Sequence, residues 1–136
     1  MKVNLVRKNK AFHFEASTSD NLVVNIDGNP AIGGEGKGAR PMELLLMGLG
    51  GCASIDLGLI LKKQRQVLED YQVTVSGQRH EDAGKSFKTI DLHFELKGDL
   101  AEAKVEKAIE LTLEKYCSVA LSLNKDIEVN YSYTIE

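Results

Sequence analysis

The chain has 136 residues, of which 43% are hydrophobic and 27% are charged, and its formal net charge is −3. This length provides a sizeable core without a disulfide or a metal, so we expect residues 1–136 to form a single domain. The mild charge and the scattered basic residues exclude no partner class outright, but they argue against nucleic acid. No apolar signal segment follows the charged first ten residues, so we expect a cytoplasmic location.

The first third of the chain predicts three strands. Val3 and Leu5 alternate with polar neighbours, and so do Phe12 and Phe14. Residues 21–26 form a further short apolar run. A period of two in hydrophobicity is typical of half-buried strands.

Residues 27–40 are rich in glycine and predict a loop. A phosphate-binding loop is one interpretation of the segment around Lys37. It fails because Gly38 follows the lysine, where the phosphate-loop pattern requires serine or threonine. A flexible loop is the simpler interpretation.

A long apolar helix is predicted from Pro41 to about Gln66 or Leu68. Proline suits the first helical turn, and residues 42–61 are mostly apolar. The segment is long enough to cross a bilayer, which makes a membrane protein one alternative. Asp56 would cost roughly 2.5–3.5 kcal/mol near the centre of a span. We therefore favour a helix buried inside the protein.

The rest of the chain predicts two strands, two helices and a last strand. The strands are expected at residues 71–79 and 88–97, and the last one near 127–133. Asp99 and Glu102 resemble a capping box at the start of the first of these helices. The element order is β-β-β-α-β-β-α-α-β, so the predicted fold class is mixed α+β.

The chain has two cysteines, Cys52 and Cys117. Most free cysteines are small buried hydrophobes, and this interpretation stays open for both. Cys117 falls where one predicted helix stops and another begins, and a thiol at a helix N-terminus can be activated. The two lie 65 positions apart (117 minus 52), too far for a local redox motif. A disulfide between them would require Cα atoms within about 4.4–6.8 Å.

A metal site is not expected, because none of the three histidines has zinc-ligand spacing to either cysteine. No cofactor is expected either.

Two blocks of the sequence resemble the OsmC/Ohr family. Residues 41–52 resemble the family's Pro-x-Glu-Leu-Leu-Leu…Gly-Gly-Cys block, and residues 115–119 resemble its second cysteine block. The resemblance implies an intertwined homodimer with sheets wrapped around two central helices. It also implies that Cys52 is the peroxidatic thiol and Cys117 the resolving thiol. Organic hydroperoxides, sometimes hydrogen peroxide, would be the substrates, and a dithiol the reductant.

One feature departs from the peroxidase branches of that family. Their early-strand arginine has no counterpart around residues 11–15, and the glutamate falls one place later, at Glu43. The helix dipole cannot replace the arginine, because Cys52 lies about 16 Å along the axis from Pro41. Arg40 is the nearest cation in sequence, and Glu43 could orient it. We take both as candidate site residues.

Two functions follow from these observations. The first is a thiol-dependent peroxidase in which Cys117 resolves a sulfenic acid on Cys52. The second is a binding protein of the same fold that holds a small apolar ligand and has weak or vestigial redox activity. The missing arginine motivates the second.

Overall fold

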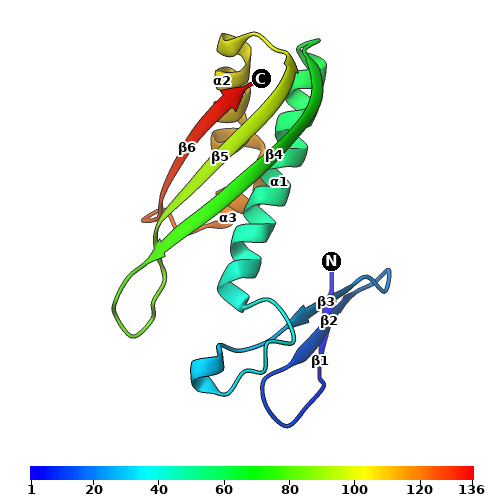
Figure 1. The fold of residues 1–136 in the computed structure, drawn as a ribbon, viewed down its shortest axis with the longest axis vertical. Helices are drawn as coiled ribbons and strands as arrows, with labels where there is room; N and C mark the ends of the chain where they lie inside the picture. The colour runs from blue at the N-terminus through cyan, green and yellow to red at the C-terminus, as the bar shows by residue number, and fades with distance from the viewer. The chain divides into compact units, whose positions relative to one another are not determined.

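The structure is a computed structural model that describes residues 1–136. The chain divides into two compact units, residues 1–45 and residues 46–136, and each is described by itself. The element order is the one that the sequence predicts, β-β-β-α-β-β-α-α-β, with two short helical turns in addition (Figure 1). The prediction of a mixed α+β fold is therefore confirmed.

The first unit contains a three-stranded antiparallel sheet in the order β1-β2-β3. Its second strand begins at Phe14 and not at Phe12, because Asn9 closes a turn. The Asn9 side chain accepts hydrogen bonds from the backbone N–H groups of Ala11 and His13, at 3.0 and 3.2 Å. The three strands are β1 (Val3–Arg7), β2 (Phe14–Thr18) and β3 (Val23–Ile26).

The glycine-rich loop of the first unit is organised around one buried carboxylate, Asp27. It accepts hydrogen bonds from the backbone N–H groups of Gly28 at 2.7 Å, Glu35 at 3.0 Å and Lys37 at 3.0 Å. At Gly34 a Cβ atom would lie only 1.8 Å from the Gly28 carbonyl oxygen, so the loop closes too tightly for any side chain there. The loop also contains the 3₁₀ turn η1 (Pro30–Ile32). The glycine-rich backbone therefore wraps around the Asp27 carboxylate and donates its N–H groups to it.

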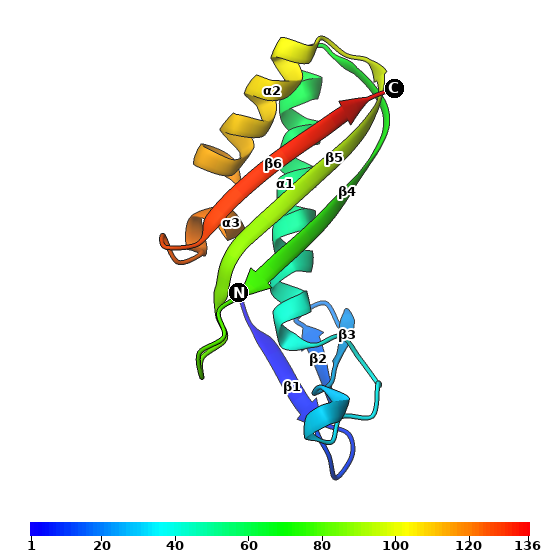
Figure 2. The same cartoon turned by 60° about the vertical axis from the view of Figure 1, so that its left-hand side comes forward.

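The second unit is built on a mixed sheet with the order β4-β5-β6. Its long hairpin joins β4 (Val67–Arg79) to β5 (Phe87–Asp99), and β6 (Glu128–Ile135) pairs with β5 in parallel (Figure 2). Parallel neighbours need a crossover connection, which the helical segment between β5 and β6 supplies. The central strand β5 carries the core: Phe87, Ile90, Leu92, Phe94 and Leu96 are buried.

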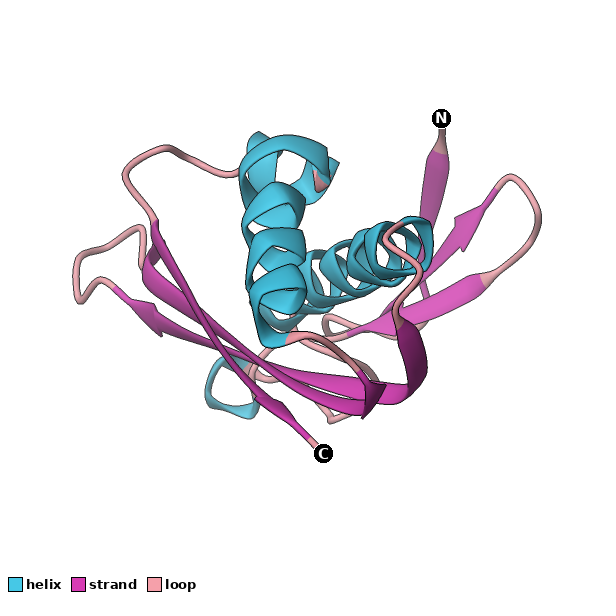
Figure 3. Ribbon diagram, turned by 90° about the horizontal axis from the view of Figure 1, so that it is seen from above, coloured by secondary structure: helices cyan, strands magenta, loops and turns pink.

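Two helices lie on one side of this sheet (Figure 3). They are α1 (Pro41–Lys63), which begins in the first unit, and α2 (Glu102–Leu111). The buried residues of α1 are Leu49, Gly50, Ala53, Leu57 and Leu61. The Tyr71 hydroxyl on β4 donates to the Ser54 carbonyl oxygen on α1 at 3.0 Å.

Two helix boundaries, the end of α1 and the start of α2, differ from the sequence prediction. The long helix ends at Lys63, because Arg65 takes the left-handed conformation, with a φ of 57°, and β4 starts at Val67. The capping box was wrong, since Asp99 is the last residue of β5 and pairs with Val67. Ala101 precedes α2 instead, without a side-chain cap.

One face of α1 is apolar and uncovered within the chain. Met47 is 58% exposed, Ile55 64% and Leu59 53%. By length and composition alone, α1 would also qualify as a membrane-spanning helix. The sequence predicts a fully buried helix, but a single chain buries only the face that packs on the sheet.

Candidate functional site

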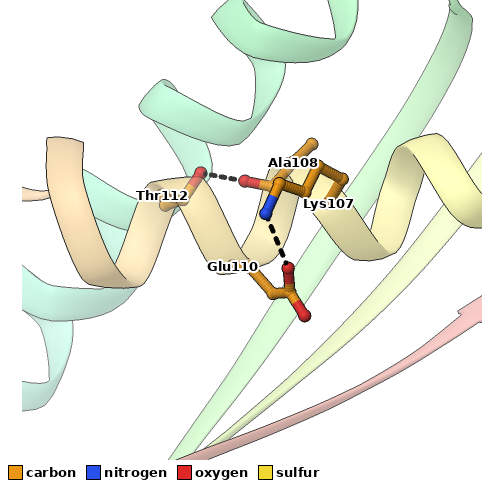
Figure 4. Close-up of polar contacts among 4 residues, drawn as sticks. All are labelled: Lys107, Ala108, Glu110 and Thr112. Atoms are coloured by element: carbon orange, nitrogen blue, oxygen red, sulfur yellow. Dashed lines mark hydrogen bonds and ion pairs between the residues drawn. The ribbon is translucent and has the colours of Figure 1, made fainter.

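The segment that carries Cys117 begins where α2 changes its winding, at Thr112. The buried Thr112 hydroxyl donates to the Ala108 carbonyl oxygen at 2.8 Å, and Lys107 pairs with Glu110 at 3.2 Å on the outer side of the helix (Figure 4). From Thr112 onward the chain forms one turn of π-helix, η2 (Thr112–Tyr116). Such turns are rare and are frequent at functional sites.

Cys117 ends the π-helical turn and starts the next helix. Its backbone N–H donates to the Thr112 carbonyl oxygen at 2.7 Å, and its own backbone is extended. The short helix α3 (Ser118–Ser122) follows, and the Cys117 sulfur accepts the Ala120 N–H at 3.4 Å. Cys117 is therefore the N-cap of α3, as its position between two predicted helices suggests, and it is fully buried.

The structure brings Cys52 and Cys117 together within the second unit. The two Sγ atoms and an oxygen of Asp56 all lie within 4.8 Å of one another. Asp56 stands one turn beyond Cys52 on α1, with its Oδ2 atom 3.8 Å from the Cys52 sulfur. The Ser118 hydroxyl lies 3.9 Å from the same sulfur. Both cysteines are free thiols, and Cys52 is half-buried.

Hydrogen bonds shift the acidity of Cys52 toward the thiolate. Partial burial by itself raises the pKa of Cys52, but the Val119 backbone N–H, the Cys117 thiol and the Ser118 hydroxyl outweigh it. The result is a pKa below the ordinary value, although the Asp56 carboxylate acts in the opposite direction. A thiolate with three donors around it is the chemically competent form of a nucleophilic cysteine.

Cys117 has the opposite tendency. Burial is the largest cause that raises the pKa of Cys117 to about 11; the hydrogen bond to Cys52 and the negative charge there add to it, and the Ala120 N–H opposes it. When the pair loses one proton, the charge therefore falls on Cys52, while Cys117 stays a thiol that donates to it.

No lysine, arginine or histidine is among the main causes of the lowered pKa of Cys52. Arg40 and Glu43 belong to the first unit. There the Glu43 carboxylate accepts the Arg40 backbone N–H at 2.9 Å, and the Arg40 carbonyl oxygen accepts the Leu44 N–H. This is one half of a capping box at the start of α1. A role for Arg40 and Glu43 beside Cys52 stays a prediction.

Sequence reasoning missed the donors around Cys52. The expected activating group was a cation, Arg40. The observed donors are the Ser118 hydroxyl and the Val119 N–H, which lie within the second cysteine block itself. The signal was the extended residue between two helices, which leaves backbone N–H groups of α3 without helical partners.

The fold and the site together define an α+β protein with a close pair of unlike thiols, one half-buried and one buried. The sequence profile of the family described as "OsmC-like protein" matches residues 34–132. The chain belongs to this OsmC-like family, as the resemblance of the two cysteine blocks predicts.

Individual relatives agree with this assignment. The chain is similar to Protein YhfA of Escherichia coli K12, with 45% identity over 100 residues, which are 73% of this chain and 75% of that protein. It is 27% identical over 119 residues to "Organic hydroperoxide resistance protein-like 1" of Staphylococcus epidermidis, covering 86% of this chain and 84% of that protein. A solved OsmC-like protein of Mycoplasma pneumoniae shares the fold, with a TM-score of 0.83 and 20% identity over 98% of this chain and 95% of that one.

Proposed function

We propose that the protein is a thiol-dependent peroxidase that reduces organic hydroperoxides and, as a further substrate, hydrogen peroxide. The observation that carries the proposal is the pair of sulfurs within 4.8 Å of each other, one of them favoured as a thiolate. Family membership supports a redox role, since one relative is named for resistance to organic hydroperoxides.

The proposed reaction uses both sulfurs. The Cys52 thiolate attacks one oxygen of the O–O bond, which breaks; the sulfur becomes a sulfenic acid, and the other oxygen takes up a proton and leaves as an alcohol. The Cys117 sulfur then attacks the sulfenic sulfur, so that a disulfide forms and water leaves. An external dithiol reduces the disulfide to restore both thiols.

The protonation states suit this sequence of steps. Cys52 must be charged to attack, and hydrogen bonds lower its pKa. Cys117 should wait as a thiol, and its pKa of about 11 keeps it protonated at neutral pH. Cys117 is also the buried member, so the half-buried Cys52 is the sulfur that a hydroperoxide can approach.

The proposal extends to the domain organisation and the oligomeric state of the protein. We propose that both units belong to one OsmC-like domain, and that the protein works as a homodimer in which two chains share the exposed face of α1. Arg40 and Glu43 are proposed to support Cys52 within that dimer. A dithiol reductant and a cytoplasmic location fit a cycle that needs its cysteines reduced.

The test is turnover by the purified, reduced protein. With cumene hydroperoxide and dihydrolipoamide, we expect steady consumption of peroxide by the wild type and none by Cys52→Ser. Given hydroperoxide without dithiol, Cys117→Ser should consume one equivalent and stop at the sulfenic acid, which dimedone traps on Cys52. Absence of turnover with organic hydroperoxides and with hydrogen peroxide, in a protein with two free thiols, would overturn the proposal.

The second candidate function is a binding protein of the same fold. It is favoured by one observation, namely that no cationic side chain is among the main causes of the lowered pKa of Cys52. Such a protein would show an ordinary, slow thiol at Cys52 and would bind an apolar ligand without consuming peroxide. The turnover experiment separates the two functions.

A further inference from the structure

Three potential metal ligands meet at one point of the second unit. The Cys52 and Cys117 sulfurs and a carboxylate oxygen of Asp56 lie mutually within 4.8 Å. The sequence offers no histidine with zinc-ligand spacing to either cysteine, and there Asp56 stands out only as a charge within an apolar helix. In the structure Asp56 completes a set of two sulfurs and one oxygen.

The spacing of these atoms suits a tetrahedral zinc ion. With Zn–S bonds of about 2.3 Å and Zn–O bonds of about 2.0–2.2 Å, tetrahedral angles separate ligand atoms by roughly 3.5–3.8 Å. The Cys52 sulfur and Asp56 Oδ2 are 3.8 Å apart already, and the remaining separations do not exceed 4.8 Å. Side-chain movements of about 1 Å would therefore bring all three ligand atoms to bonding distance of one ion.

The backbone holds the three ligands in a suitable way. Cys52 and Asp56 stand at positions i and i+4 of α1, where side chains lie on the same face of a helix. Cys117 comes from a different segment and is fixed by its N-cap position and by burial. Two ligands from one helical turn and a third from across the core are an ordinary plan for a zinc site.

We propose that the reduced protein binds one Zn²⁺ ion per chain through Cys52, Asp56 and Cys117. Two sulfur ligands select a soft, thiophilic ion over Mg²⁺ or Ca²⁺, which prefer sites made of oxygen alone. Three protein ligands leave a fourth position to water, so the ion is exchangeable and enters from the side of the half-buried Cys52.

The metal site has a consequence that rests on the proposed function. Zinc and a hydroperoxide need the same two sulfurs, so the bound ion inhibits turnover. Conversely, one hydroperoxide oxidises the two thiolates to a disulfide, takes up two protons and leaves as alcohol and water. The disulfide cannot ligate zinc, and the ion is released. Metal-bound and oxidised forms are thus alternative states of one pair of sulfurs.

The test uses Co²⁺ as a spectroscopic substitute for zinc, with protein that has been reduced, treated with a chelator and shown to have two free thiols. We expect sulfur-to-cobalt charge-transfer absorption, the visible bands of tetrahedral cobalt, one ion per chain, and displacement by Zn²⁺. Cys52→Ser and Cys117→Ser should lose the charge-transfer intensity in part. Asp56→Asn should weaken Co²⁺ binding by roughly 10–100-fold or more.

Asp126→Asn is the matched control, because Asp126 is exposed and lies in the same unit. It should bind Co²⁺ like the wild type. The Asp56 variant keeps both cysteines, and its circular dichroism checks its fold. Absence of charge-transfer absorption, or equal affinity in the Asp56 and Asp126 variants, would overturn the site.

Turnover measured with and without Zn²⁺ keeps the two proposals distinguishable. Peroxidase activity that is insensitive to equimolar Zn²⁺ overturns the metal site and leaves the enzyme proposal standing. Metal binding without any peroxidase activity supports the site and overturns the enzyme.

Discussion

At the scale of single residues, the state of the Cys52 sulfur depends on a balance among its immediate neighbours. Three donors stabilise the thiolate, while partial burial and the Asp56 carboxylate favour the thiol. Two of the donors come from residues that directly follow Cys117 in the chain. The second cysteine block therefore supplies both a resolving thiol and part of the environment that charges the first sulfur.

The first prediction concerns the pH dependence of Cys52 alkylation in chelator-treated, reduced protein. We expect half-maximal reactivity of the wild type below the ordinary thiol value of about 8.5. Asp56→Asn should shift the curve to still lower pH, because removal of a like charge favours the thiolate. Iodoacetamide labelling followed by mass spectrometry gives the curve for each cysteine separately.

Two controls accompany this measurement. Asp126→Asn should leave the alkylation curve unchanged, whereas Cys117→Ala removes a donor and should move it to higher pH. Cys117 itself should stay unlabelled at neutral pH, because it is buried and its pKa is raised to about 11. A Cys52 curve centred at or above the ordinary value would contradict the balance described above.

The second prediction concerns Asp27, whose carboxylate holds the glycine-rich loop. The Lys37 N–H is the largest cause of a lowered pKa of Asp27, and the N–H groups of Glu35 and Gly28 add to it against the effect of burial. A carboxyl with a depressed pKa stabilises the fold above its unfolded value of about 3.9, and this stability is lost as the pH falls through the folded pKa. Asp27→Asn should therefore lower the thermal midpoint at pH 7.

Thermal denaturation between pH 3 and pH 7 provides the measurement. The difference between the wild type and Asp27→Asn should be full at neutral pH and should shrink below about pH 4. Asp20→Asn, an exposed change in the same unit, should behave like the wild type. A pH-independent difference would mean that the carboxylate charge has no part in the loop's stability.

At the scale of elements, the sequence predicts types and order well and boundaries less well. Alternating side chains reveal β5 because one face of this strand is buried, whereas β1 alternates although all of its residues are exposed in the single chain. Arg65, in contrast, has no pattern that predicts its left-handed backbone, and Asp99 has the right spacing for a cap but is occupied in the sheet. The hydrogen-bond donors around Cys52 likewise depend on tertiary contacts, which is why the sequence pattern does not predict them.

The third prediction concerns the close contact between α1 and β4 at Gly50. A methyl group there would lie 2.8 Å from a Val75 methyl group, so overpacking should outweigh the gain in helix propensity of about 1 kcal/mol. We expect Gly50→Ala to destabilise the protein by about 1–3 kcal/mol in urea unfolding. The double variant Gly50→Ala with Val75→Ala should recover part of this loss, because the shorter side chain at position 75 makes room for the new methyl group. Additive effects of the two changes would contradict a direct contact.

At the scale of the whole molecule, one chain leaves an apolar helix face uncovered. Gly48, Gly51, Ile55 and Leu59 follow one another at spacings of three and four residues on α1, and all four are exposed. The spacing places them on a single face, and the two glycines allow another helix to approach closely. The amphipathic pattern alone could not tell whether a sheet, a lipid or a second chain covers that face.

The last prediction follows from the proposed homodimer. In a two-fold dimer the same face of α1 is used by both chains, so one substitution places two charges in the interface. Ile55 is 64% exposed in the single chain, and we expect Ile55→Lys to convert a dimer into monomers in light scattering, whereas Ile55→Leu stays dimeric. Because this face adjoins Cys52 on the helix, peroxide turnover should fall together with the dimer fraction and should recover at high protein concentration. A monomeric wild type, or an Ile55→Lys variant that stays dimeric, would place this face outside the interface.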